Sequence, residues 1–226
     1  MSNNIIDNYK RLGILHKLIK TDIKQYLNIQ ESIISVNDIE KEIKKICTKW
    51  FKLEKDKTNE NIEFAFPIGI GINHVTAHWN PIYINPTNES IYSITPKYYN
   101  KDNDIIKIDI GIYNTQGNII DSAFSYSKNE ELIKLIEISE QSTQLMIKNS
   151  GNEVLLSDLG QIVEEYIKSK EIKIKNKIYQ LNVIGSLCGH ELKKNSLHGG
   201  KAVPNINYPI YKERMFENEI YAIDHL

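Results

Sequence analysis

Three aspartates and one histidine stand out because each interrupts an apolar strand pattern or follows a glycine. Asp109 lies within IKIDIGI, Asp121 ends GNIID, Asp224 follows EIYAI, and His190 follows a glycine in LCGH. Aspartate is disfavoured in strands, and two facing carboxylates repel each other unless a cation or a proton lies between them. Carboxylate oxygens with one imidazole favour Mn, Fe or Co in an open, hydrolytic site over a closed structural zinc site.

Taken singly, each of these residues has an ordinary explanation. Asp109 and Asp121 would face solvent if their strands lie at the edge of a sheet, and His190 would be a hydrogen-bonded histidine of the core or the surface. The hypothesis of a metal site therefore depends on the set and not on any one member.

Two pairs of histidines add to this set, although the chain has only 6 histidines. His190 and His198 share the glycine-framed stretch LCGHELKKNSLHGG, and His74 and His78 share GINHVTAHWNP. Their positions alone leave both a ligand-binding role and an ordinary polar role open.

These residues need a scaffold, and the periodicity of the sequence predicts one made of helices and strands. Apolar residues repeat at intervals of three and four over residues 5–26, so an amphipathic helix is expected there. Ser35 with Asp38 resembles a capping box that opens a second helix, and Ser157 opens another over 157–170. A further helix is expected over 129–149.

The segment that carries Asp109 and Asp121 predicts a hairpin. IIKIDIGIYNTQGNIIDSAFSYS is typical of two strands around a turn at 114–118, so the two carboxylates could face each other. Helix pairs between groups of strands predict an α+β or mixed α/β domain in which helices cover a curved sheet.

Composition and charge narrow the class of protein. The 226 residues carry a net charge of −1, which gives no electrostatic case for nucleic acid or an anionic membrane. The 2 cysteines, Cys47 and Cys188, make no disulfide framework. The sequence also lacks an apolar run of membrane-spanning length and the apolar core of a signal peptide. We therefore expect a cytoplasmic protein without a membrane partner.

Four motifs occur in a fixed order, namely FPIGIGINHVTAHWNP, KIDIGIYNTQGNIIDSAF, GHELKKNSLHGGKAVPN and ENEIYAID. With them the chain resembles the type II methionine aminopeptidases of the pita-bread metallopeptidase family, from about Tyr9 to Asp224. The resemblance implies an α+β pita-bread fold, in which helices cover a curved antiparallel sheet. It also implies removal of the N-terminal methionine from nascent polypeptides with two divalent metal ions, Co, Mn, Fe or Zn.

The resemblance further assigns roles to individual residues. The implied metal ligands are Asp109, Asp121, His190 and Asp224, with Asp121 bridging the two ions. The implied catalytic residues, which also bind substrate near the scissile bond, are His78 and His198. Phe66 and Leu197 match positions that line the methionine side-chain pocket, whereas His16 and His74 match no functional position and are expected to be ordinary polar residues.

Two departures from the family pattern affect what the chain is expected to do. Asp224 stands where the family has a glutamate, and the sequence ends at Leu226, before the closing strands and the final bridging glutamate. We therefore expect one pita-bread domain over 1–226 that is truncated at its C-terminus, with a completing C-terminal segment as a partner. The alternative is a catalytically impaired or non-catalytic pita-bread binding protein.

Overall fold

The structure, a computed structural model, describes residues 3–81 and 97–223. Within this range the chain divides into two units, one that runs to Asn129 and one that begins at Glu130. Each unit is described by itself.

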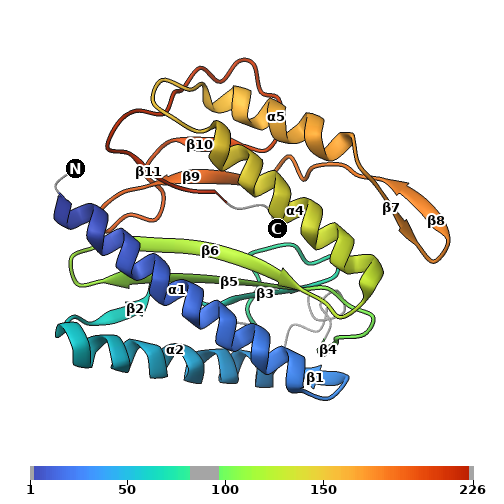
Figure 1. Cartoon of the computed structure of the whole chain (residues 1–226), viewed down its shortest axis with the longest axis horizontal. Helices are drawn as coiled ribbons and strands as arrows, with labels where there is room; N and C mark the ends of the chain where they lie inside the picture. The colour runs from blue at the N-terminus through green and yellow to red at the C-terminus, as the bar shows by residue number, and fades with distance from the viewer. Residues whose placement is uncertain (1–2, 82–96, 224–226) are drawn as a thin grey trace, which may run out of the picture. The chain divides into compact units, whose positions relative to one another are not determined.

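The first unit combines long helices with short antiparallel strands (Figure 1). Its elements, in chain order, are α1 (Asn3–Ile29), β1 (Ile33–Ser35), α2 (Val36–Thr58), β2 (Ile62–Phe64), β3 (Gly69–Ile72), β4 (Tyr98–Asn100), β5 (Ile106–Asn114) and β6 (Ile119–Tyr126).

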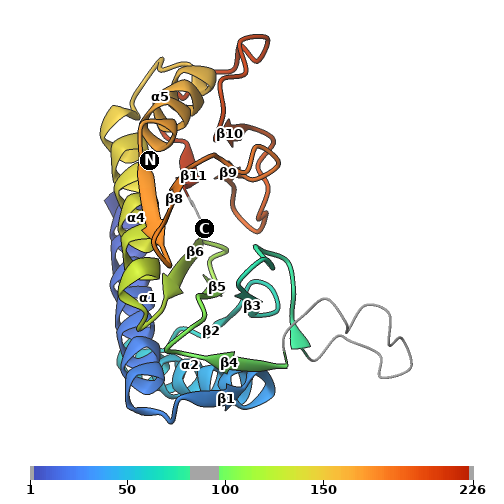
Figure 2. The same cartoon turned by 90° about the vertical axis from the view of Figure 1, so that its right-hand side faces the viewer.

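Helix α1 confirms the amphipathic helix that the sequence predicts. Its apolar stripe is buried at Leu12, Leu15, Ile19, Ile23 and Leu27, each at most 3% exposed. These side chains lie in one core with isoleucines of β5 and of α2, because residues three and four apart share a face of a helix. Figure 2 shows α1 along one side of β5 and β6.

Strand β5 is the centre of the antiparallel sheet in this unit. One of its edges pairs with β6 along nearly its whole length, and the other pairs with β3 and then with β2. Successive side chains of a strand point to opposite faces. The alternate isoleucines Ile108, Ile110 and Ile112 are fully buried in the core beneath the helices, so the residues between them point to the opposite face.

Helix α2 begins after Ser35, as expected, but the predicted capping box is wrong. Ser35 is the N-cap residue and makes no side-chain capping hydrogen bond. It instead belongs to β1, which pairs with β4, and the backbone N–H of Val36 donates to the carbonyl of Lys97 at 3.0 Å. A partner far along the chain therefore satisfies the first amide of this helix. Figure 2 shows the β1–β4 pair beside α2.

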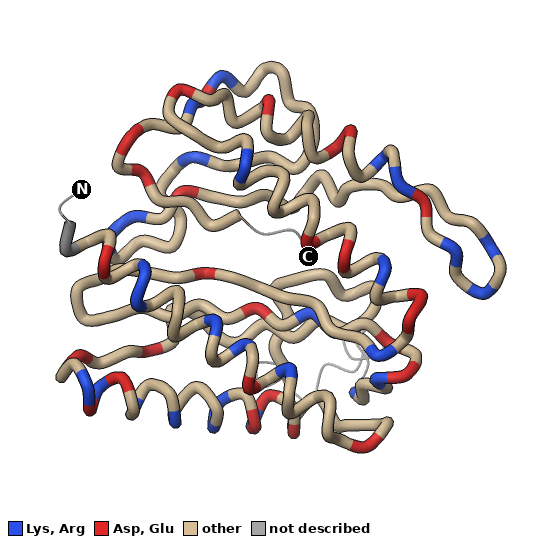
Figure 3. The backbone as a smooth tube through the Cα atoms, in the orientation of Figure 1, with Lys and Arg blue, Asp and Glu red and all other residues tan. Residues whose placement is uncertain are grey.

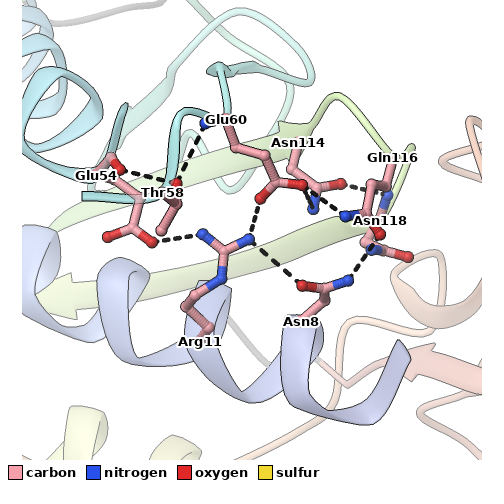
Figure 4. Close-up of polar contacts among 8 residues, drawn as sticks. All are labelled: Asn8, Arg11, Glu54, Thr58, Glu60, Asn114, Gln116 and Asn118. Atoms are coloured by element: carbon pink, nitrogen blue, oxygen red, sulfur yellow. Dashed lines mark hydrogen bonds and ion pairs between the residues drawn. The ribbon is translucent and has the colours of Figure 1, made fainter. Parts of the chain in front are cut away.

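A polar cluster joins the two helices to the β5–β6 turn (Figure 4). Arg11 of α1 forms ion pairs with Glu54 of α2 and with Glu60 just beyond it. Glu60 accepts a hydrogen bond from Gln116 of the turn at 2.8 Å, and Gln116 accepts one from Asn8 of α1, also at 2.8 Å. Arg11 is thus the cation on which the carboxylates of this corner converge.

The second unit packs helices on two small antiparallel sheets. Its elements are α4 (Glu130–Asn149), α5 (Leu156–Lys168), β7 (Glu171–Ile174), β8 (Lys177–Gln180), β9 (Cys188–Leu192), β10 (Ala202–Pro204) and β11 (Ile220–Ala222). Strands β7 and β8 form a hairpin, and β9 is the central strand between β10 and β11. Figure 2 shows α4 and α5 together on one side of the β9 sheet.

The core of this unit lies between α5 and the β9 sheet. It includes Met146, Leu159, Val163 and Val203, all fully buried. The prediction that Ser157 opens α5 is wrong by two residues, because the N-cap is Leu155 and it makes no side-chain capping hydrogen bond. The backbone of Leu156 donates to the carbonyl of Glu213 at 3.0 Å, which again replaces a local cap with a distant partner.

The two units together confirm the α+β class, with helices covering antiparallel sheets. Within residues 3–81 and 97–223, no helix combines the length and the apolar character needed to cross a membrane. Figure 3 shows basic and acidic positions interleaved along α2, where Lys45 pairs with Glu42 at 2.9 Å. Interleaved charges of this kind are typical of a solvated helix face.

Candidate metal and substrate site

The register of the β5–β6 hairpin puts Asp109 and Asp121 on one face of the sheet. Asp109 lies opposite Ala123, and Asp121 lies opposite Gly111. Directly opposite residues of an antiparallel pair share a face, and residues two apart on one strand do so as well. The two aspartates are therefore diagonal neighbours on the face away from the helical core.

Diagonal neighbours in a sheet lie about 7–8 Å apart, with their Cβ atoms somewhat closer, and two carboxylate side chains can span this distance through an ion. Both aspartates are half-buried, and the Oδ1 atom of Asp109 is buried. Carboxylate oxygens on one face of a partly desolvated sheet are the donor type that a divalent ion takes, so this pair fits such an ion.

Phe66 lies on the same face, directly over Gly111. A Cβ built on Gly111 would lie 2.1 Å from Cε1 of Phe66, so only glycine lets the ring approach the strand here. The segment is held in place by a backbone hydrogen bond from Ala65 N to Gly111 O at 2.9 Å. An aromatic ring beside two carboxylates is the arrangement expected of an apolar side-chain pocket next to a metal site.

His78 lies on the loop after β3, and two hydrogen bonds hold the residues that follow it against β3 and the residue just before β3. Asn80 Nδ2 donates to the carbonyl of Ile68 at 2.5 Å, and Ile70 N donates to Trp79 O at 2.8 Å. His78 is exposed and adopts a left-handed backbone conformation with φ of 58°. The imidazole is therefore exposed to solvent, while hydrogen bonds hold the backbone that follows it in place.

Lys107 is a residue of this region that the sequence reasoning missed. It points to the same face as Asp109, is only 6% exposed, and its Nζ donates to the carbonyl of Asn73 at 2.6 Å. Burial lowers the pKa of Lys107 to about 8. A lysine at the period-two spacing of IKID, within an isoleucine-rich strand, is the signal that would have identified it.

His16, which is expected to be an ordinary polar residue, makes a buried hydrogen bond. It is 3% exposed in the helical core, and its Nε2 lies 2.8 Å from the carbonyl oxygen of Ile110. Its Nε2 carries the hydrogen, because a carbonyl oxygen only accepts.

In the second unit, His190 and His198 lie together. Their ring centroids are 4.5 Å apart, with an angle of 48° between the ring planes. His190 is half-buried on the central strand β9, opposite Ala202 of β10 and Ala222 of β11. His198 is exposed on the loop between β9 and β10, where the adjacent Leu197 is half-buried.

The complete set of predicted ligands remains a prediction. Asp109 and Asp121 belong to the first unit and His190 to the second, whereas Asp224 lies outside the described residues. Among residues 3–81 and 97–223, no group of three or more His, Cys, Asp or Glu side chains lies at metal-ligand spacing.

Comparison with known proteins identifies the family to which the sequence is related. The profile of metallopeptidase family M24 matches residues 9–224. Methionine aminopeptidase 2 of Sclerotinia sclerotiorum is 27% identical over 225 residues, covering 99% of this chain and 47% of its own length. Methionine aminopeptidase 2 of Schizosaccharomyces pombe is 33% identical over 172 residues, covering 76% of this chain and 37% of its own length.

A solved structure shares the fold. The methionine aminopeptidase of Rickettsia prowazekii superposes with a TM-score of 0.69 at 16% identity, covering 98% of this chain and 78% of that chain. This likeness confirms the predicted pita-bread fold, and the comparisons confirm the resemblance to methionine aminopeptidases. The chain spans about half or less of the length of the curated relatives it matches.

Proposed function

This chain belongs to metallopeptidase family M24, and from this premise we propose that it removes the N-terminal methionine from nascent polypeptides. The observation that supports the proposal most strongly is the position of Asp109 and Asp121 on one face of the β5–β6 hairpin, with the Phe66 ring beside them. Two aspartates on one face of a hairpin are the residues that a metal-dependent hydrolase would use there, whereas a binding protein would not require them.

The proposed cofactors are two divalent metal ions, drawn from Co, Mn, Fe or Zn. Asp109, Asp121, His190 and Asp224 would hold them, with Asp121 bridging the pair. When bound, such ions lower the pKa of a water molecule and polarise the scissile carbonyl. This donor set is rich in carboxylate oxygens and has one imidazole, which suits an open catalytic centre.

The remaining proposed roles belong to residues that contact the peptide. His78 and His198 would hydrogen-bond the substrate near the scissile bond and stabilise the charge that develops on the carbonyl oxygen. Phe66 and Leu197 would enclose the methionine side chain. Such an apolar pocket discriminates between neighbouring side chains by about 1–3 kcal/mol per methylene.

The proposal includes a C-terminal segment that completes the site and a cytoplasmic location. Because the chain spans about half of its curated relatives, a segment beyond the matched region would supply the bridging glutamate that the resemblance implies. Strand β11 lies at the edge of its sheet in the described part of the chain and offers a place for a further strand to pair. The free thiols of Cys47 and Cys188 fit a reducing compartment.

The test measures methionine release from a Met-Ala-Ser peptide with Mn or Co added. The assay uses the chain alone and the chain joined at Leu226 to the C-terminal segment of a methionine aminopeptidase 2. We expect the joined form to release methionine, to leave an acetylated peptide intact, and to lose the activity on Asp109→Asn. Asp56→Asn, at an exposed position of α2, is the matched control and should have no effect.

Two results would contradict the proposal. One is the absence of methionine release from both forms, together with calorimetric titrations in which Mn and Co do not bind. The other is release that persists in Asp109→Asn, because the hairpin carboxylates would then have no part in the reaction. In the active form, His78→Ala should lower kcat by about 10²–10⁴, the range for a positioned acid–base group.

A further inference from the structure

The connection between β9 and β10 departs from a regular ladder opposite Glu191. In each hydrogen-bonded pair of a regular antiparallel ladder, a residue both donates to and accepts from the residue opposite it. Here Glu191 N donates to Lys201 O at 2.9 Å, whereas Glu191 O accepts from Gly199 N at 2.6 Å. The residues from Gly199 to Lys201 thus stand opposite one residue, as in a large β-bulge, and Gly200 within them has φ of 118°.

The side chain of Glu191 fills the space beneath this bulge. A Cβ built on Gly199 would lie 2.8 Å from Cγ and 2.9 Å from Cδ and Oε2 of Glu191. Glu191 is only 4% exposed, so its carboxylate is enclosed by the chain that folds over it. A residue larger than glycine at position 199 would therefore collide with the side chain of Glu191.

Lys193 links the carboxylate to the bulge. Its Nζ lies 3.3 Å from Oε2 of Glu191 and donates to the carbonyl of Gly199 at 2.6 Å. The contact with the carboxylate is an ion pair and not a hydrogen bond, and a counter-ion at this distance lowers the cost of burying the carboxylate. The same ammonium group holds the backbone carbonyl that follows His198.

His198 lies next to these contacts, and its own carbonyl accepts a hydrogen bond from Ser196 Oγ at 3.1 Å. Its ring lies 4.5 Å from that of His190, but His190 is held by a strand with partners on both sides, and His198 stands exposed on the loop. The loop begins with a tight turn in which Lys193 and Ser196 exchange backbone hydrogen bonds of 2.9 and 3.0 Å. After that turn, Gly199, the residue that follows His198, donates its N–H to Glu191 O and accepts a hydrogen bond from Lys193 Nζ.

We propose that Glu191 and Lys193 are positioning residues that hold the His198 imidazole against His190 in the geometry needed for substrate binding. The catalytic part of this inference rests on the proposed function, in which His198 contacts the peptide. The structural part, the contact between the two rings, does not depend on any activity.

The test compares Lys193→Met, which keeps the aliphatic stem and removes the ammonium group, with Lys193→Arg, which keeps the positive charge for Glu191 and a donor for Gly199. Lys194→Met, at the exposed neighbouring lysine, is the matched control. In metal-free protein with isotope-labelled histidines, NMR should show a cross-peak between the two imidazole rings in the unmodified chain and in the control. The cross-peak should be lost in Lys193→Met and restored in Lys193→Arg.

The kinetic readout uses the active form of the aminopeptidase assay. Displacement of a contact group by about 1 Å costs up to about 10²-fold in rate, so Lys193→Met should lower kcat/KM by about 10- to 100-fold. Calorimetric affinity for the metal ion should stay unchanged, because the His190 strand is intact. Gly199→Ala, whose Cβ would collide with Glu191, should reproduce both losses through a different perturbation.

The outcomes separate the two proposals. If Lys193→Met and Gly199→Ala both keep the cross-peak at full intensity, Glu191 and Lys193 do not position His198. If the cross-peak is lost but kcat/KM is unchanged, the ring contact has no role in substrate binding and the inference is also wrong. If the unmodified active form releases no methionine, the proposed function fails, whereas the cross-peak still decides the structural part.

Discussion

His16 should make the stability of the first unit depend on pH in a predictable direction. The side chain is buried in the helical core, where its Nε2–H donates to Ile110 O and its uncharged form is favoured. Burial is the largest influence and lowers the pKa of His16 from 6.5 to about 4, with a smaller opposing effect from the Ile110 hydrogen bond. Nearby Lys20 lowers it further, and Asp121 raises it.

The sign and the size of the effect follow from proton linkage. The unfolded chain takes up the proton near pH 6.5, and the folded chain takes it up only near pH 4. The stability contributed by neutral His16 is therefore complete above pH 6.5, falls as the pH drops from 6.5 to 4, and is gone below that window. The difference between the two pKa values corresponds to about 3 kcal/mol in total.

The assay is urea unfolding at pH 7.5 and at pH 4.5, with EDTA present so that no metal ion contributes. His16→Gln is the matched variant, because its amide N–H can still donate to Ile110 and cannot titrate in this range. We expect the free energy of unfolding of the original chain to fall by about 2–3 kcal/mol more than that of the variant.

Equal losses in the two proteins would refute the reasoning. The titrating carboxylates are common to both, so their effects cancel in the comparison. An equal loss would mean that the folded chain protonates His16 near pH 6.5, as the unfolded chain does, and not near pH 4.

Three further predictions concern packing and the polar corner. Arg11→Met should lower the free energy of unfolding by about 1–3 kcal/mol in chemical denaturation, because Glu54 and Glu60 lose their shared cation (Figure 4). An unchanged free energy of unfolding would mean that solvent screens both ion pairs. Gly111→Ala should lower the free energy of unfolding by about 1–3 kcal/mol, because the added methyl group collides with Phe66. Adding Phe66→Ala should recover part of this stability, and strictly additive effects of the two substitutions would argue against the contact. Ile108 is fully buried, so Ile108→Ala should lower the free energy of unfolding by about 2–5 kcal/mol, whereas Ile14→Ala at a 63% exposed position should lower it far less. Similar changes in the melting temperature of the two variants would contradict the assigned core.

The sequence by itself determined the elements whose signal is periodic. The three-and-four spacing of apolar residues predicted α1, because one face of any helix in water must be buried. The alternation in IKIDIGI and GNIID predicted the hairpin, and the turn length then set the register that puts Asp109 and Asp121 on one face. The four motifs in their order carried the resemblance to the family, and the family profile that matches residues 9–224 confirms it.

Tertiary structure alone decided the contacts between segments that are distant along the chain. Ser35 has the sequence of a capping box, but pairing with β4 satisfies the first amide of α2 through Lys97 instead. The approach of Phe66 to Gly111 and the enclosure of Glu191 by Gly199 follow from how strands and loops pack, for which neighbouring residues give no periodic signal. Local propensities fix which backbone conformation a segment prefers, whereas the long-range partners that complete its hydrogen bonds and fill its space are chosen only when the chain collapses around a core.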